Sequence, residues 1–346
     1  MVAHPTTRRV AAAVIRFLIR RLVTSVVLLI LVSIVTFGIF LLLPKLTGTD
    51  IARMYAGKVT DPAAVEGIRI KLGFDKPIWE QYGLFMKGIL VGRDFANGPD
   101  VDHCPAPCFG YSFRNNQPVW PLLTDRFPVT ASLAVGAAIL WLIGGVLSGV
   151  VSALRRGTIL DRSMMLVALA GVSLPVYFTG LLAQLIFVHQ LHWFPGGQYI
   201  NFSDDPVGWA LKLLPAWITL ALLYAATYTR LTRATMLETM GEDYIRTARA
   251  KGLRERAVVS KHAMRAVLTP IVTIFGLDLG GLLGGAILTE RVFSLPGLGL
   301  LAVNAIPQLD LPIVMGVTLF AAFFIIFANL LVDLLYAVID PRVRLS

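Results

Sequence analysis

Charged side chains are scarce in this sequence. Asp, Glu, Lys and Arg make up 15% of its 346 residues, whereas 56% are hydrophobic and the mean hydropathy is +0.72. An apolar fraction of this size exceeds what the core of a soluble globular protein needs. The sequence therefore predicts that lipid, rather than water, surrounds most of the chain.

Sequence signatures of catalysis are missing. The chain has no G-x-x-x-x-G-K-[ST] loop, so it lacks the backbone cradle and the lysine that hold the phosphates of ATP. Its apolar segments contain no Ser/His, paired-Asp or His-Glu-x-x-His constellation of an intramembrane hydrolase. We therefore expect no catalytic residue, no enzymatic activity and no cofactor bound by this chain.

Cysteine is nearly absent as well. Only Cys104 and Cys108 occur, which are too few for a disulfide framework or a four-thiolate zinc site. A metal site at this pair would need ligands beyond the nearby His103, and we expect no metal. A small disulfide loop and two free thiols are the remaining alternatives.

Long uncharged runs are what the sequence has in abundance. A helix needs about 20 apolar residues to cross a hydrocarbon core of about 30 Å. The first run is longer than the ~7–15-residue core of a signal peptide and no cleavage site follows it, so we expect it to be retained. The sequence predicts an all-α polytopic membrane protein with six transmembrane helices, in the runs 22–43, 127–154, 163–191, 213–229, 269–289 and 312–332.

The distribution of Lys and Arg orients these spans. If the N-terminus is cytoplasmic, 155–162 and 230–268 lie inside and 44–126, 192–212 and 290–311 lie outside. Nineteen of the 31 basic residues then fall in the cytoplasmic segments and termini, as the positive-inside rule requires. The retention of Lys and Arg in the cytoplasmic segments of a protein in a lipid bilayer thus explains the net charge of +10. Because the sequence has no basic soluble domain, we expect no nucleic-acid partner.

The outer segment 44–126 is too long for a plain connector. Within it, 61–72 and 77–90 have helical apolar spacing, and we expect a small ordered extracytoplasmic domain between helices 1 and 2. Outside the membrane the disulfide between Cys104 and Cys108 is the favoured alternative, because oxidising compartments preserve such bonds. The expected division of the chain is 1–43, 44–126, a five-helix core 127–338 with the loop 230–268, and a cytoplasmic tail 339–346.

Several residues within the spans are candidates for pathway or packing roles. Asp278 is an ionisable group at membrane depth, where such groups are costly and face a cavity or a partner, although it could also be hydrated near the inner side. The glycines at 280, 281, 284 and 285 form two overlapping G-x-x-x-G pairs, so Gly281 and Gly285 are expected to permit close helix packing rather than to contact substrate. Pro175 predicts a kink in the third span. Glu290 and Arg291 could pair and fix the loop 290–311.

The most informative polar stretch is 241–253 in the long cytoplasmic loop. Acidic residues at its start, basic residues toward its end and a glycine that can adopt a left-handed conformation predict a short helix. Its small side chains would let another protein approach closely, and a helix resting on anionic lipid is the alternative. The candidate residues are Asp243, Tyr244, Ile245, Arg246, Thr247, Ala248, Arg249, Ala250, Lys251 and Gly252.

This stretch resembles the coupling loop of binding-protein-dependent ABC importer permeases, specifically the B-type subunit of dipeptide and oligopeptide systems. The resemblance extends over nearly the whole chain. The further motifs that carry it are Arg20-Arg21, Leu72-Gly-Phe-Asp-Lys-Pro77, Gln81-Tyr82, Asp161-Arg162, His262-Ala-Met-Arg265 with Pro270, Glu290-Arg-Val-Phe-Ser-Leu-Pro-Gly-Leu-Gly299, Asn329-Leu-Leu-Val-Asp-Leu-Leu-Tyr336 and Asp340-Pro-Arg342.

The resemblance implies a type I ABC importer fold in a bacterial cytoplasmic membrane. It implies a second homologous permease subunit, two ATPase subunits that bind ATP and Mg, and an extracytoplasmic substrate-binding protein. The helix 243–252 would sit in a groove of one ATPase and move with it, which would switch the spans between inward and outward openings. The implied cargo is a short peptide.

Two features depart from the family pattern. Arg246-Thr247-Ala248 stand where the general importer signature has Glu-Ala-Ala, which fits the peptide branch and argues against an acidic contact. The stretch around Cys104 and Cys108 is unlike the family core, so its role stays open. Nickel or another small conjugate is an alternative cargo for the same architecture, and an ion-coupled secondary transporter is an alternative of another class, for which only Asp278 lies at depth.

Overall fold

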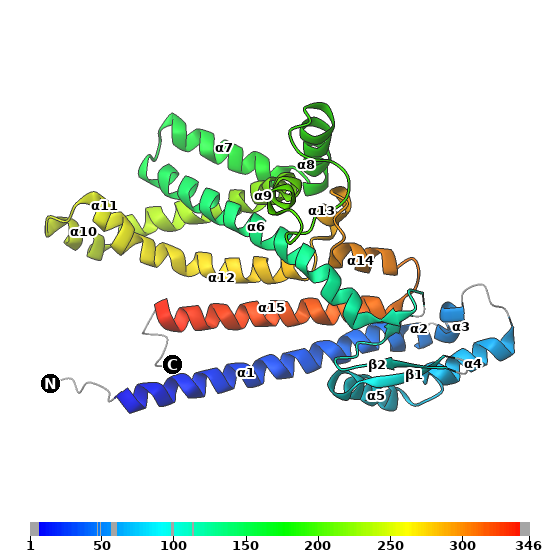
Figure 1. The fold of residues 1–346 in the computed structure, drawn as a ribbon. Coiled ribbons are helices and arrows are strands. Elements are labelled where there is room, and N and C mark those ends of the chain that lie inside the picture. Colours follow the sequence, from blue (N-terminus) through cyan, green and yellow to red (C-terminus); the bar gives the residue numbers. More distant parts are fainter. Residues whose placement is uncertain are drawn as a thin grey trace.

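The fold was analysed in a computed structural model that describes residues 7–46, 48, 50–56, 61–97, 100–112 and 114–339 (Figure 1). The predicted tail 339–346 lies outside these residues, except for Ile339. Within them the chain forms a helical bundle with two small β-hairpins, so the all-α prediction holds for the bundle but missed strands in the outer segment.

The elements follow the chain in this order. They are α1 (Thr7–Phe37), the π-helical η1 (Gly38–Leu42), α2 (Leu43–Leu46), α3 (Ile51–Ala56), α4 (Pro62–Leu72), α5 (Ile78–Val91), β1 (Arg93–Asn97), β2 (Asp100–Cys104), β3 (Tyr111–Ser112), β4 (Gln117–Pro118), α6 (Val119–Leu154), α7 (Ile159–Ser173), α8 (Val176–Ala183), η2 (Gln184–Gln190), α9 (Pro206–Met240), α10 (Asp243–Ala250), α11 (Glu255–Ala257), η3 (Val258–Ala263), α12 (Met264–Leu283), α13 (Ile287–Val292), α14 (Leu298–Ala305) and α15 (Leu311–Ile339).

Five stretches of helix in the described part of the chain are long and apolar enough to cross a membrane. They are Ile19–Leu42, Val119–Leu154, Pro206–Met240, Glu255–Leu283 and Leu311–Leu334. A sixth span is formed if the bent pair of α7 with α8 and η2 crosses once. Five of the six predicted runs therefore fall mainly in continuous helices of the described residues, and the third falls in a bent pair of helices.

The third predicted span, 163–191, is not a straight helix. The chain breaks at Pro175, and the two halves differ in direction by 100°. Proline has no backbone N–H to donate and forces the preceding residue toward extended geometry, which Leu174 adopts at φ −92° and ψ 127°. The predicted kink is thus a complete change of direction.

Two other spans have different ends from those predicted. Helix α9 runs well beyond 213–229 on both sides, and it begins where the Asp205 side chain accepts a hydrogen bond from the Val207 amide at 3.1 Å. Helix α12 stops at Leu283, short of the predicted end at 289, because the chain turns at Gly285, whose φ is 127°. Gly285 therefore lies outside the helix.

The core of the bundle is the packing of α6 against α9. Small residues allow it: a Cβ on Gly145 would lie 3.0 Å from the Ala225 carbonyl oxygen, and one on Gly149 would lie 2.8 Å from that of Thr229. Beside these contacts the Trp141 ring is fully buried and stacks on Tyr224 with ring centroids 4.6 Å apart.

Helix α12 packs against α15, and glycines again set the approach. A Cβ on Gly280 would meet the Ile325 Cα at 3.0 Å, and one on Gly284 would meet the Ala321 Cα at 3.3 Å. Gly281 has no atom within 4 Å of its Cβ position, and Gly285 lies against the Gly299 backbone instead. The packing role expected for Gly281 is wrong within this chain, because it lies on the opposite face of the helix.

Helix α1 lies alongside α15 at the edge of the bundle (Figure 1). Arg21 Nη2 donates to Asp333 Oδ1 at 2.6 Å, which joins the two helices near one end. The start of α1, the end of α15 and the α10–α11 segment lie at this end of the bundle, and α2 to α5 with the β1–β2 hairpin lie at the other.

The outer segment is ordered where its sequence pattern predicts helices. The stretches 61–72 and 77–90 form α4 and α5, and α4 begins at Asp61, whose side chain accepts from the Ala63 amide. Next to them β1 and β2 pair antiparallel, with Phe95 opposite Asp102.

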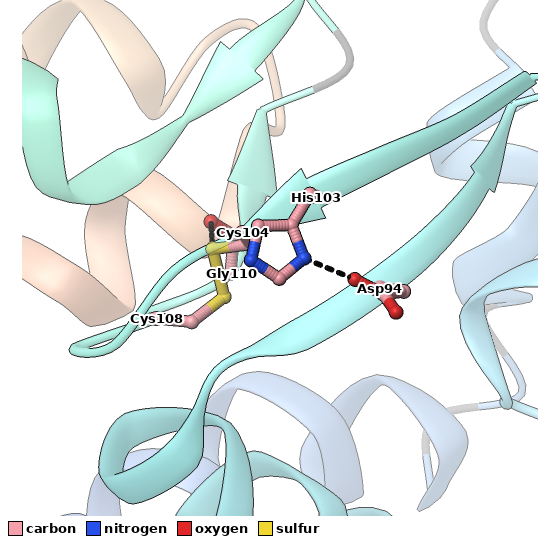
Figure 2. Close-up of a disulfide and its surroundings, with 5 residues drawn as sticks. All are labelled: Asp94, His103, Cys104, Cys108 and Gly110. Carbon is pink, nitrogen blue, oxygen red and sulfur yellow. Dashed lines mark hydrogen bonds and ion pairs between the residues drawn. A yellow bond between two sulfur atoms is a disulfide. The ribbon is translucent and has the colours of Figure 1, made fainter.

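A disulfide closes the loop after β2 by joining Cys104 and Cys108, both of which are buried (Figure 2). On the exposed side of the hairpin, His103 Nδ1 and Asp94 Oδ1 are 2.5 Å apart. In the described part of the chain no three His, Cys, Asp or Glu side chains gather as metal ligands would.

The outer segment is tied to the bundle at the start of α15. The Ser112 hydroxyl donates to the buried carboxylate of Asp310, and Asn115 Nδ2 lies 3.4 Å from the same oxygen. The Val119 amide, at the start of α6, donates to the Gly110 carbonyl oxygen at 3.0 Å. The segment is therefore attached to the starts of α6 and α15.

Gly280→Leu should destabilise the protein by about 1–3 kcal/mol, because the added side chain has no space against α15. Thermal unfolding in detergent measures the effect. Gly281→Leu is the matched control, since the same change one residue away points into open space. Equal losses for both variants would contradict this account of the packing.

Candidate functional site

The stretch singled out in the sequence forms α10, at the end of the bundle opposite the outer segment (Figure 1). Ile245 is fully buried and Ala248 is 5% exposed. Both belong to the main hydrophobic core, together with Val258 in η3 and Val267 in α12. Two side chains one turn apart thus seat this short helix firmly on the bundle.

The opposite face of α10 is exposed. The Asp243 side chain is 94% exposed and that of Arg246 is 72% exposed, and their side chains are 3.3 Å apart. Tyr244 is 45% exposed, and partial burial together with the Glu242 carboxylate raises its pKa above the ordinary value. The expectation that Ala248 contributes to this face is wrong, because Ala248 packs inward; Thr247 and Ala250 are the small residues that remain outside.

The end of α10 is held by backbone and side-chain contacts. Gly252 has φ 76°, the left-handed region that glycine adopts without strain, and its amide donates to the Arg249 carbonyl oxygen at 2.9 Å. Arg249 Nη2 donates to Glu255 Oε1 at 2.7 Å, which raises the pKa of Arg249. The exposed Lys251 follows the last helical residue. The helix therefore ends sharply and the chain returns directly to η3.

An ion pair with a buried carboxylate braces the bundle near this end. Asp161, in the first turn of α7, receives two hydrogen bonds from Arg233 of α9, at 2.7 Å from Nε and 2.9 Å from Nη2. Ser152 of α6 and the Gly157 amide donate to the same carboxylate, at 2.5 Å and 2.9 Å. One carboxylate thus joins α6, α7 and α9.

Sequence reasoning did not pair Asp161 with Arg233. Asp161 belongs to the motif Asp161-Arg162, and Arg233 lies in the basic segment 230–268, 72 residues farther along the chain. One signal in the sequence could have indicated this pair. Asp161 lies in the short loop 155–162 and has no basic residue on its own helix face to neutralise it.

A second buried network holds the loop between α12 and α15. Glu290 is fully buried and accepts hydrogen bonds from the Leu300 amide at 2.8 Å and from Thr130 Oγ1 of α6 at 2.8 Å. Thr130 Oγ1 in turn accepts from the Leu298 amide at 2.9 Å. Burial raises the pKa of Glu290, against the opposing effect of these donors.

The expected pair of Glu290 with Arg291 is therefore wrong. Arg291 is exposed, and the carboxylate of Glu290 turns inward to backbone amides and a hydroxyl. Backbone N–H groups of a tight loop are themselves good donors to a carboxylate. The loop is fixed, as expected, but by its own backbone rather than by a surface ion pair.

Asp278 has a partner within the bundle. Tyr228 of α9 donates a hydrogen bond from its hydroxyl to Asp278 Oδ2 at 2.9 Å. Asp278 therefore connects α12 with α9 and is half-buried, rather than fully hydrated.

Comparisons with known proteins identify the family of this chain. Residues 14–134 match the N-terminal part of binding-protein-dependent transport system membrane components, and residues 145–345 match the family of binding-protein-dependent transport system inner membrane components. The chain belongs to this family. It is a multi-pass membrane component of a transport system and not a catalytic subunit.

Similar curated proteins cover almost the whole chain. A Brucella abortus protein named as a peptide transport system permease is 40% identical over 94% of this chain and 98% of its own length. The dipeptide transport system permease protein DppB of Escherichia coli K12 is 35% identical over 95% and 99%. The solved inward-facing structure of the MetNI methionine ABC transporter aligns with 63% of this chain and 96% of its own, with a TM-score of 0.49 and 17% identity.

Asp161→Ala should lower the melting temperature of the purified protein by several degrees, because Arg233 is left without its carboxylate and three helices lose their common contact. Asp243→Ala is the control, since its carboxylate is almost fully exposed and its removal should leave stability unchanged. Scanning calorimetry in detergent, or thermal unfolding followed by fluorescence without a thiol-reactive dye, measures the melting temperatures of both variants. An unchanged melting temperature for Asp161→Ala would contradict the bracing role.

Proposed function

We propose that this chain is a permease subunit of an ATP-binding-cassette importer for dipeptides or oligopeptides in the bacterial cytoplasmic membrane. It forms half of the translocation pathway and pairs with a second, homologous permease subunit. Two ATPase subunits, which carry ATP and Mg, bind at the α10 end, and an extracytoplasmic substrate-binding protein delivers the cargo at the other. Both termini lie in the cytoplasm.

One observation carries the mechanical part of the proposal. Helix α10 is buried through Ile245 and Ala248 but exposes Asp243, Tyr244, Arg246 and Thr247 at the tip of the bundle. A short helix of this kind can transmit displacement, because its inner face is locked into the core while its outer face is free to bind. Closure of the ATPases would then move α10 and, with it, the ends of α9 and α12.

The bracing contacts support this transmission. Asp161 with Arg233 joins α6, α7 and α9 next to α10, so a push at α10 reaches three spans together. The alternative for α10 is a helix that only rests on anionic lipid. In that case no protein would bind its exposed polar face.

The names of the similar proteins support a peptide cargo. At 35–40% identity over nearly their full lengths, the relatives are described as peptide or dipeptide permeases. Nickel or another small conjugate carried by the same architecture remains the second candidate cargo. An ion-coupled transporter is less well supported, because Asp278 is already engaged by Tyr228.

Thr247→Trp tests the proposed docking face. Thr247 is exposed in the middle of α10, so a large side chain there changes the outer face without disturbing the end of the helix. A substitution at Gly252, whose φ is 76°, would disturb that end. The variant is assembled with candidate ATPase subunits, the partner permease and the binding protein in liposomes. We expect substrate-stimulated ATP hydrolysis and dipeptide uptake to fall to the unstimulated level.

Arg156→Trp provides the matched control, because Arg156 is an exposed residue of the neighbouring α6–α7 loop. It should retain both activities. If the wild-type chain assembles with no ATPase subunit, or if Thr247→Trp transports as well as wild type, the proposed coupling role is wrong.

A further inference from the structure

A cavity with both apolar and polar walls lies at the end of α9 that is farthest from α10. Its volume is about 400 Å³, and it lies between η2, the loop that precedes α9, the first turns of α9 and the turn after α13. The polar residues that line it are Gln184, His189, Gln198, Lys212 and Ser294. A cavity of this size holds a small molecule rather than only a water or two.

Lys212 is the charged group of this cavity. The residue is 8% exposed, and its ammonium donates one hydrogen bond, to the Gly197 carbonyl oxygen at 2.6 Å. An ammonium has three donors, and a buried charge is costly unless an opposite charge or several hydrogen bonds compensate it. A single carbonyl is weak compensation, and the cavity lies where a further acceptor could bind.

The carboxylates nearest in the sequence are used elsewhere. Asp204 accepts hydrogen bonds from Asn201 and Ser203, and Asp205 caps the start of α9. In the described part of the chain Lys212 forms no ion pair, and no Asp or Glu lines the cavity. The cavity therefore has a positive character that its own walls do not neutralise.

The position of Lys212 also runs against the charge pattern of the chain. In the predicted outer loops 192–212 and 290–311, only Lys212 and Arg291 are basic. Arg291 is exposed, so Lys212, which the structure places in the first turns of α9, is the one Lys or Arg of these two segments that the fold encloses. A lysine needed only to fix the loop at Gly197 could be replaced by any neutral donor.

We propose that this cavity binds the carboxylate of a small substrate, with Lys212 as the charged ligand and the amides of Gln184 and Gln198 as further donors. The inference rests on the proposed function, under which the substrate is a short peptide and the carboxylate is its C-terminus. The cavity lies toward the outer end of the bundle and next to the Phe293–Ser294 turn, beside the loop that Glu290 holds. The site is thus on the side where the cargo arrives.

Direct binding to the assembled permease tests the site without the binding protein, which would impose its own selection. The complex of both permeases and the ATPases is placed in phosphatidylcholine nanodiscs, and ligand-detected NMR measures the affinity for alanyl-alanine and for alanyl-alanine amide. Wild type should bind the free acid about tenfold more tightly than the amide, as loss of one charge-assisted hydrogen bond predicts.

Lys212→Gln should remove this difference, because glutamine keeps a donor for Gly197 but not the charge. Lys87→Gln, at an exposed lysine of α5, is the matched control and should behave as wild type. Equal affinity of wild type for acid and amide, or unchanged discrimination in Lys212→Gln, overturns the assignment. A merely structural role for Lys212 would alter stability but not the ratio of the two affinities.

The same complexes distinguish a lipid headgroup from a substrate. If phosphatidylglycerol added to the nanodiscs is retained in a Lys212-dependent manner and the acid does not compete with it, the anion is a lipid phosphate and the substrate assignment is wrong. Uptake of alanyl-alanine by wild type with the binding protein tests the proposed function separately from the Lys212 site. No uptake overturns the proposed function and the site together, whereas uptake without acid preference at the permease overturns the site alone.

Discussion

The close packing of α6 against α9 is the contact on which the other parts of the bundle depend. Glycines at 145 and 149 let the two backbones approach where lipid offers no hydrophobic drive for association. Each end of this pair then holds a neighbour through a buried carboxylate. Near α10, Ser152 and Arg233 donate hydrogen bonds to Asp161 of α7. At the other end, Thr130 donates to Glu290 and accepts from the Leu298 amide. The pair thus connects the loops at the two ends of the bundle.

Sequence patterns predicted the positions of most helices well, but they predicted poorly where those helices break and which of their side chains are buried. Six apolar runs correspond to five long helices and one bent pair of helices, since composition and length indicate which segments can cross a membrane. Breaks inside such runs are harder to place: Pro175 predicted a kink but not a 100° turn, and Gly285 was expected inside a helix that ends before it. The short strands β1 to β4 were missed, because the Gly- and Pro-rich stretch around them carries no alternating pattern.

The candidate site illustrates the same limit. The position and helical form of 243–252 followed from charge placement and from Gly252, but the inward orientation of Ala248 did not, because only the seat formed by η3 and α12 decides which face is buried. Likewise Glu290 was paired with its charged neighbour Arg291, whereas the folded loop offers it backbone amides. Partners far apart in the chain, such as Asp161 with Arg233 or Tyr228 with Asp278, leave no local signature in a single sequence.

Helix α9 is continuous from the cavity of Lys212 to Met240, and two residues separate it from α10. At 1.5 Å per residue its 35 residues span about 52 Å. A tilt of about 5° around its midpoint would therefore displace each end by about 2 Å in opposite directions. The helix has the geometry of a lever, in which a small displacement at the α10 end changes the width of the Lys212 cavity at the other end.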